Sequence, residues 1–341
     1  MSVIAPVFSF GLNGYTGIEA RMTRRGGEKT MQSVIGIDIS KDTLDAYRLS
    51  DDMHTRACND KLGHRALMRW IGQTDTSLIV FEATGAYHRE LEARFAAADL
   101  PYAKVNPRQS RRFAEVTGRL AKTDRVDAIM LARMGAMLGL QRQEPPSDEI
   151  VDLREFLAAR RALMKDKVAA KTRLQTTTQD LLRRQISVRL RQIEVQIAQI
   201  DAAMSKKVMQ NEALSQKLAI LVSIPGIADV TAISMIVEMP ELGTLDGKKA
   251  ASLAGLAPVS RQSGKWRGKE HIQGGRTFVR RAVYMPALVA VQRNAQLKAK
   301  YNQLIEAGKP PKLALTAIMR RLIVLANALI RDRRQWSEIR P

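Results

Sequence analysis

The feature that most limits the fold of this chain is residues 149–222, a helix-favouring stretch that contains neither proline nor glycine. Within it, apolar residues recur at alternating spacings of four and three, forming a heptad seam of Ile186, Leu190, Ile193, Ile197, Ile200 and Met204. Such a seam packs against another helix, either in the same chain as a hairpin or in a partner chain. We therefore predict a long helical coiled-coil segment over 149–222.

The chain is strongly basic, with 55 lysine and arginine residues against 34 acidic ones, a net charge of +21 and a pI near 10.4. Residues 1–140 have a net charge of +4, and residues 141–341 have +17. A surplus of this size favours a polyanionic partner, either nucleic acid or an anionic membrane surface. The single cysteine, Cys58, excludes an internal disulfide framework and a cysteine-based zinc site, which fits a reducing cytoplasm.

The membrane is the weaker of these two partners. No uninterrupted run approaches the roughly 18 apolar residues of a membrane span, so we predict no transmembrane helix. No helical pattern combines a strongly apolar face with flanking aromatic residues, so we expect no membrane-surface helix either.

The first half of the chain alternates short apolar runs with helical patterns. We predict strands at 34–39, 43–50, 54–59, 78–82 and 102–105, and helices at 61–72, 87–98 and from 107 to 140. This order predicts a mixed sheet with helices packed against it. Pro145-Pro146, Pro225-Gly226 and polar stretches set the predicted boundaries. They give a poorly ordered extension at 1–30, a domain at 31–145, the coiled-coil segment at 149–222, a mainly helical domain at 223–331 and a tail at 332–341.

Four acidic residues occupy positions that can form one site. Asp38 and Glu82 each lie at the C-terminal end of an apolar strand, so they emerge side by side if those strands are neighbours. Asp124 and Asp127 are three residues apart and share one face of a helix. Converging carboxylates repel each other unless cations bind between them, and hard oxygen ligands suit Mg²⁺ or Mn²⁺. Each acid alone has an ordinary structural explanation, such as a helix N-cap at Asp124, but the joint pattern on a basic protein points to metal-dependent phosphodiester chemistry.

The motifs around these acids resemble one family. Ile35-Gly-Ile-Asp-Ile-Ser-Lys41, Phe81-Glu-Ala-Thr-Gly85, Asn106-Pro107 and Lys122-Thr-Asp-Arg-Val-Asp-Ala128 are similar to motifs of the DEDD transposases of insertion sequences. Ser223-Ile-Pro-Gly-Ile227, Leu253-Ala-Gly-Leu-Ala-Pro258, Gln262-Ser-Gly264 and Arg280-Arg-Ala-Val-Tyr-Met-Pro286 resemble the C-terminal signatures of that family. The resemblance covers about residues 31–331. It implies an α/β RNase-H-like (RuvC-like) N-terminal domain and a mainly α C-terminal transposase domain with a nucleophilic serine.

By position, the resemblance implies that Asp38, Glu82, Asp124 and Asp127 bind the metal and that Ser263 attacks DNA to form a phosphoserine intermediate. It also implies a structured bridge RNA that pairs with target and donor DNA. Because strand exchange between two duplexes needs several active sites, we expect a homo-oligomer, a dimer or tetramer, with the heptad seam as a candidate interface. The expected location is the cytoplasm, in association with the nucleoid.

The residues around Ser263 suit contact with DNA. A serine hydroxyl is a poor nucleophile without a base or a metal, and a chain with only four histidines argues against a Ser-His-Asp triad. Gly264 permits close backbone approach, Trp266 can stack on a base, and Arg261, Lys265 and Arg267 can hold phosphate oxygens. The bland alternative is a basic surface loop in which Ser263 only forms a turn, and Ser260 is the nearby rival nucleophile.

Other basic residues could either contact phosphate groups or simply form a solvated surface. They are Arg276, Arg280 and Arg281 in the C-terminal domain and Arg183, Arg184, Arg189 and Arg191 in the coiled-coil segment. Ser223-Ile-Pro-Gly-Ile-Ala-Asp-Val230 resembles the turn of a helix-hairpin-helix, which can hold one DNA phosphate, or it is a plain connection between helices.

The acids and the basic charge predict a metal-dependent enzyme acting on nucleic acid, and the resemblance implies an RNA-guided DNA recombinase that mobilises an insertion sequence. One alternative is a RuvC-like, metal-dependent nuclease that uses water, with Ser263 incidental. The other is a non-catalytic, basic nucleic-acid-binding protein whose acids are structural.

Overall fold

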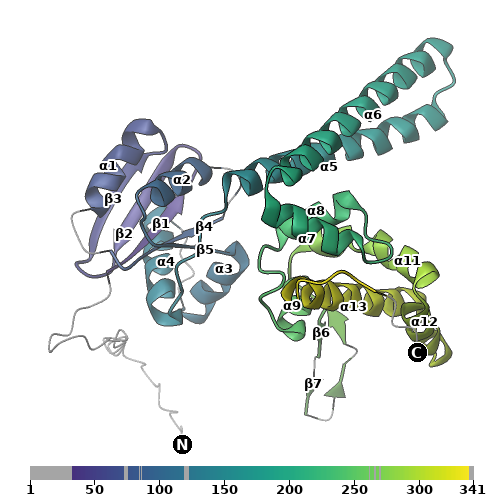
Figure 1. Cartoon of the computed structure of the whole chain (residues 1–341). Helices are drawn as coiled ribbons and strands as arrows, with labels where there is room; N and C mark the ends of the chain where they lie inside the picture. Colours follow the sequence, from purple (N-terminus) through teal and green to yellow (C-terminus); the bar gives the residue numbers. More distant parts are fainter. Residues whose placement is uncertain are drawn as a thin grey trace, which may run out of the picture. The chain divides into compact units, whose positions relative to one another are not determined.

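The computed structural model describes residues 33–72, 76–83, 85, 87–118, 123–260, 262–264, 266–268 and 270–337. The extension expected over 1–30 lies outside these residues. The chain divides into two compact units, residues 1–145 and 146–341, and each is built around its own core (Figure 1).

A five-stranded mixed sheet forms the centre of the first unit. Its strands are β1 (Val34–Ile39), β2 (Thr43–Arg48), β3 (Met53–Cys58), β4 (Leu78–Glu82) and β5 (Tyr102–Val105), in the order β3-β2-β1-β4-β5. Strands β1, β2 and β3 pair antiparallel, whereas β4 runs parallel to both β1 and β5. The predicted mixed sheet is confirmed, and its order is compatible with an RNase-H-like domain.

Helices cover both faces of this sheet. They are α1 (Lys61–Ile71), α2 (Arg89–Ala97), α3 (Pro107–Val116) and α4 (Asp124–Leu138). Because side chains alternate along a strand, Ile35 and Ile37 of β1 face the core formed with α1 and α2, while Val34 faces the core formed with α4. Asp38 has the same parity as Val34 and therefore lies on the face that α4 covers.

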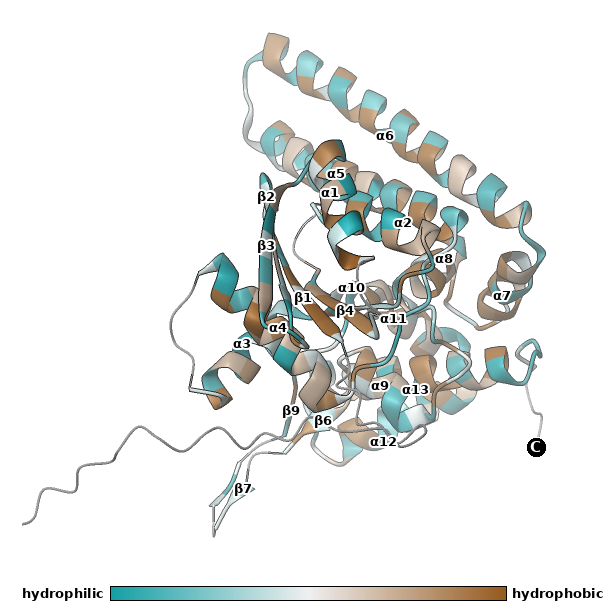
Figure 2. Cartoon of the chain, turned by 90° about the vertical axis from the view of Figure 1, so that its left-hand side faces the viewer, coloured by the Kyte–Doolittle hydropathy of each residue, from teal (hydrophilic) through white to brown (hydrophobic). Residues whose placement is uncertain are grey.

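The second unit begins with a helical hairpin of α5 (Asp148–Thr176) and α6 (Asp180–Met209), which run alongside each other in Figure 1. The predicted seam is buried at Ile193, Ile197 and Met204 of α6, and Figure 2 shows apolar and polar residues alternating along this helix. Of the two predicted partners for the seam, the structure has the hairpin within the chain, with a turn at 177–179. The hairpin ends at 209 rather than 222, because the chain turns again at 210–211 and α7 (Glu212–Val222) folds into the core beyond.

Ion pairs fix the direction of the hairpin. Arg160 Nε lies 2.6 Å from Asp201 Oδ1, and Lys167 Nζ lies 2.9 Å from Glu194 Oε1. The later residue of α5, Lys167, pairs with the earlier residue of α6, Glu194, so the two helices are antiparallel. The seam therefore finds its partner helix within the same chain, which removes the reason to assign those buried residues to an interface between copies.

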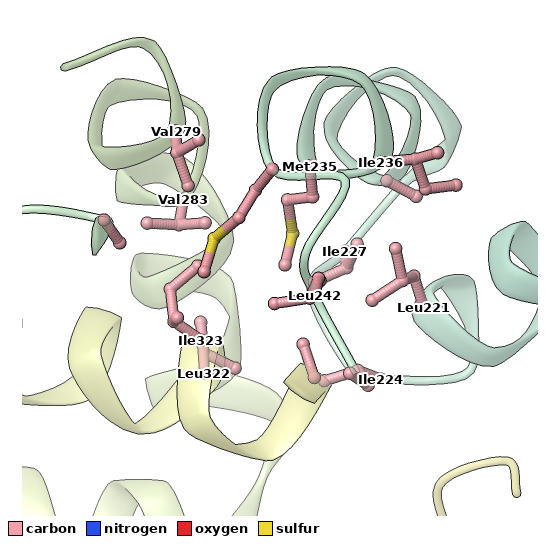
Figure 3. Close-up of a cluster of buried hydrophobic side chains, with 14 of the residues drawn as sticks. Leu221, Ile224, Ile227, Met235, Ile236, Leu242, Val279, Val283, Leu322 and Ile323 are labelled. Atoms are coloured by element: carbon pink, nitrogen blue, oxygen red, sulfur yellow. The ribbon is translucent and has the colours of Figure 1, made fainter. Parts of the chain in front are cut away.

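The rest of the second unit is mainly helical. Its helices are α8 (Asp229–Glu238), α9 (Gly247–Leu253), α10 (Thr277–Ala282), α11 (Tyr284–Arg293), α12 (Ala295–Glu306) and α13 (Pro311–Arg331). Two short strand pairs lie between α9 and α10: β6 (Pro258–Val259) with β9 (His271–Ile272), and β7 (Gln262–Ser263) with β8 (Trp266–Arg267). Figure 3 shows the common core, in which Leu221 and Ile224 lie near Met235, Leu242 and Leu322.

By length and composition alone, helix α13 could cross a membrane. The prediction of no transmembrane helix did not anticipate this, because polar residues interrupt the apolar runs of α13. Its buried side chains, among them Ile318, Leu322 and Leu329, belong to the core that α13 shares with α7, α9, α11 and α12. This packing accounts for the apolar composition of α13.

Candidate active site

Helix α4 packs so closely on β1 that only a glycine fits between them. A Cβ atom on Gly36 would lie 2.0 Å from the carbonyl oxygen of Ala128 and 2.4 Å from the amide nitrogen of Ala132. Thr123 caps the helix, since its hydroxyl accepts a hydrogen bond from the amide of Val126 at 3.3 Å. The Gly36 contact and this cap bring the first turn of α4 to the end of β1.

The four predicted carboxylates lie near this edge of the sheet, close enough to influence one another's charge. Asp38 follows the cross-strand pair of Ile37 and Phe81, so the parallel pairing of β1 and β4 sets Asp38 beside Glu82. The pKa of Asp38 is raised to about 6, first by burial and then by the negative charges of Asp127, Asp124 and Glu82. The carboxylates from β1, β4 and α4 thus share one electrostatic environment.

The donor set fits a divalent cation in chemistry, because four carboxylates offer the hard oxygen ligands that Mg²⁺ and Mn²⁺ prefer. In the part of the chain that the structure describes, however, no three Asp, Glu, His or Cys side chains are close enough to enclose an ion as they stand. The side chain of Asp124 is 53% exposed, so this carboxylate has room to adjust. An ion would neutralise the negative charges that, after burial, raise the pKa of Asp38.

A fifth carboxylate and an arginine belong to this environment and were missed from the sequence. Asp45 of β2 lies directly opposite Asp38, and Arg56 of β3 lies directly opposite Asp45. Asp45 is 3% exposed, and its Oδ2 is 3.4 Å from Arg56 Nε. The same guanidinium lies 3.7 Å from Asp124, so Arg56 supplies positive charge to both acids. The alternation of side chains along paired strands was the signal that could have found this row, once the register was known.

The predicted nucleophile lies on a small exposed hairpin of the second unit. Ser263 pairs with Trp266 across β7 and β8, and Gly264 in the turn has a φ of +55°, a left-handed conformation that favours glycine. Ser263, Trp266 and Arg267 are all exposed, with Trp266 60% so. The rival Ser260 donates a hydrogen bond to Glu270 Oε1 at 2.8 Å. Arg261 and Lys265 lie outside the described residues.

Two of the three candidate phosphate-binding residues near α10 have partners within the chain. Arg276 forms a two-pronged ion pair with Glu241 at 2.5 and 2.6 Å and also donates to the carbonyl of Glu238. Arg280 donates to the carbonyl oxygens of Gly255 and Gly274. These bonds hold the loops around α10, whereas Arg281 is exposed.

Two other basic or turn motifs also have structural partners. In the hairpin, Arg183 donates to the carbonyl of Thr177 at 2.7 Å and closes the turn between α5 and α6. The predicted helix-hairpin-helix turn joins α7 to α8, with Ile224 and Ile227 in the core and the hydroxyl of Ser223 accepting from the amide of Trp336 at 2.8 Å.

Comparisons with known proteins show which family the chain resembles. Residues 35–182 match the model of the DEDD transposase domain of IS110, and residues 218–302 match the transposase family of IS116, IS110 and IS902. The chain is 29% identical to pilin gene-inverting proteins of Moraxella lacunata and Moraxella bovis, over 90% of its own length and 98% of theirs. It is 28% identical to a protein of insertion element IS116 of Streptomyces clavuligerus over 40% of this chain and 35% of that one. The chain therefore belongs to the IS110 and IS116 family of DEDD transposases, which are DNA strand-exchange enzymes.

Proposed function

We propose that this transposase exchanges DNA strands through a covalent phosphoserine at Ser263, with Asp38, Glu82, Asp124 and Asp127 as ligands of Mg²⁺ or Mn²⁺. The observation that supports it best is the concentration of carboxylates around Asp38, whose pKa is raised first by burial and then by the negative charges of Asp127, Asp124 and Glu82. An exposed serine on a glycine turn is the second support, because a nucleophile that attacks a DNA backbone must be accessible.

In the proposed reaction, Ser263 Oγ attacks a phosphorus atom of DNA and loses its proton. The bond from phosphorus to the 3′ oxygen breaks, and that oxygen takes up a proton and leaves as a 3′-hydroxyl. A 3′-hydroxyl of the other duplex then attacks the phosphoserine, which rejoins the strand and releases the serine. A bound divalent metal would lower the pKa of the attacking hydroxyl and stabilise the departing oxygen. The carboxylates hold that charge in place, and the reaction consumes no water or nucleotide cofactor.

The surroundings of Ser263 suit the binding of a DNA strand. Trp266 is exposed for stacking on a base, and Arg267 is exposed for a phosphate. Arg261, Lys265 and Arg281 are proposed as further phosphate contacts. Arg276 and Arg280 are left out of this set, because their guanidinium groups hold the protein's own loops.

Relatives named for pilin gene inversion suggest that the same exchange inverts a DNA segment when its two recombination sites have opposite orientations on one molecule. We further propose that a structured RNA chooses the sites and that a dimer or tetramer performs the exchange at the nucleoid. The net charge of +17 on residues 141–341 suits a polyanionic partner, DNA and RNA alike, so the RNA rests on the family resemblance. Ribonuclease treatment of the isolated complex tests the RNA: strand exchange should stop and should return when the transcript of the element's end is added.

Mass spectrometry of the Ser263 peptide tests the covalent step. Protein expressed with its native flanking DNA and digested with nuclease should show a nucleotide remnant on Ser263, and Asp124→Ala protein should not. Ser260→Ala is the matched control, since it alters a serine three residues away and should keep the adduct.

Loss of DNA cutting in Ser263→Ala but not in Ser260→Ala would support the proposal. Cutting that continues without any serine adduct would instead establish a nuclease that uses water. Tight, salt-sensitive DNA binding with no cutting in any variant would make the chain a binding protein.

A further inference from the structure

A buried hydroxyl on α3 contacts one of the four carboxylates. Ser110 is fully buried, and its Oγ donates a short hydrogen bond to Glu82 Oε1. The two residues come from different elements, because Glu82 ends β4 and Ser110 lies one turn into α3. No charge or spacing in the sequence pointed to Ser110, so this contact is visible only in the fold.

The start of α3 determines where this hydroxyl lies. Asn106 caps the helix by accepting from the amide of Arg108 at 2.9 Å, and Pro107 occupies the first helical position. The amide of Ser110 bonds to the carbonyl of Asn106 at 3.2 Å, which holds the fourth residue of the helix toward the end of β4.

The hydroxyl has two acceptors for one hydrogen. Ser110 Oγ also lies 3.0 Å from the carbonyl oxygen of Pro107, the ordinary backbone partner of a helical serine. A carboxylate is the stronger acceptor of the two, since hydrogen bonds to an ionised oxygen are shorter and stronger than those to a neutral one. The hydrogen bond to Glu82 therefore fixes the position of one carboxylate oxygen and restricts the rotation of the whole carboxylate.

We propose that Ser110 is a positioning residue that orients Glu82 for metal binding. This inference rests on the proposed metal site. Residues that orient a metal ligand from behind typically contribute about 10- to 100-fold in metal affinity. Removal of the hydroxyl should therefore weaken metal binding without removing a ligand.

Mn²⁺ binding to the full chain, measured by electron paramagnetic resonance or calorimetry without DNA, tests this role apart from activity. Ser110→Ala should weaken Mn²⁺ binding about 10-fold. Ser110→Thr keeps a hydroxyl and should restore most of the affinity. The control is Thr117→Ala at the end of the same helix, whose exposed hydroxyl bonds to the carbonyls of Phe113 and Ala114 and whose loss should leave Mn²⁺ affinity unchanged.

A double-mutant cycle separates this role from a general effect on folding. In a Glu82→Ala background, Ser110→Ala should cause no further loss of affinity, because the oriented group is gone. Equal Mn²⁺ affinity in wild type and Ser110→Ala, or equal losses in the Ala and Thr variants, would refute the role of the hydroxyl while leaving the metal site intact. Equal Mn²⁺ affinity in the wild type and in Glu82→Ala would overturn the metal site itself and the Ser110 inference with it.

Discussion

Substituting Asp38 with asparagine should stabilise the metal-free protein although it removes a proposed metal ligand. Asparagine has nearly the same shape as aspartate and no charge. Folding raises the pKa of Asp38 from 3.8 to about 6, so the folded state binds a proton more tightly than the unfolded chain does. The unfolding free energy of the wild type therefore falls as the pH rises from about 4 to about 6, and the penalty is complete above that window.

The magnitude follows from the pKa shift. A shift of about two units corresponds to at most about 3 kcal/mol, and partial exposure of the carboxylate to solvent reduces this to about 1 kcal/mol. Asp38→Asn should then raise the melting temperature of the first unit by about 4 °C near neutral pH in the presence of a chelator.

Calorimetry of the full chain across this pH range measures the effect, and Asp42→Asn on the exposed turn after β1 is the control. The advantage of Asp38→Asn should vanish below about pH 4 and should shrink when Mg²⁺ is added to both proteins. A variant less stable than the wild type at neutral pH, or a difference that does not change with pH, would refute the electrostatic account of this site.

Three further substitutions test the packing. Gly36→Ala should lower the unfolding free energy by about 3 kcal/mol or more, measured by urea unfolding, because the new methyl group meets the backbone of Ala128; an unchanged midpoint would show that α4 can move away. Arg276→Met should cost about 1 kcal/mol by losing the pair with Glu241, while DNA affinity stays the same; a clear loss of affinity would return Arg276 to the DNA-binding set. Ile197→Asn should expose the hairpin to limited proteolysis at an unchanged mass in solution; a drop in mass would assign the seam to an interface between copies.

The sequence predicted the sheet well because local pattern determined it. The apolar runs at 34–39 and 78–82 are buried strands, and each expected strand appears within a few residues of its predicted bounds. The expectation that Asp38 and Glu82 emerge side by side required only that their strands be neighbours, and the parallel pairing of β1 and β4 meets that condition.

The remainder depends on contacts between distant residues. Strand register places Asp45 and Arg56 beside the predicted acids, and the capped first turn of α3 places Ser110 against Glu82. The heptad seam indicated a helix partner, but the identity of that partner depended on the turn at 177–179, which no glycine or proline marks. Likewise, arginine composition alone could not distinguish Arg276, which is paired with Glu241, from the exposed Arg281.

The contact of Gly36 with Ala128 also has a consequence for the newly made protein. It joins residues about ninety positions apart, and contacts of such long range form late in folding. Because α4 ends at Leu138, a ribosome must release that helix before the carboxylates can gather, and Ser263 is made later still. An unfinished chain that ends before residue 138 therefore lacks the complete α4, and one that ends before residue 263 lacks the proposed nucleophile. By the proposed mechanism, neither chain can begin to break the DNA from which its message is being transcribed.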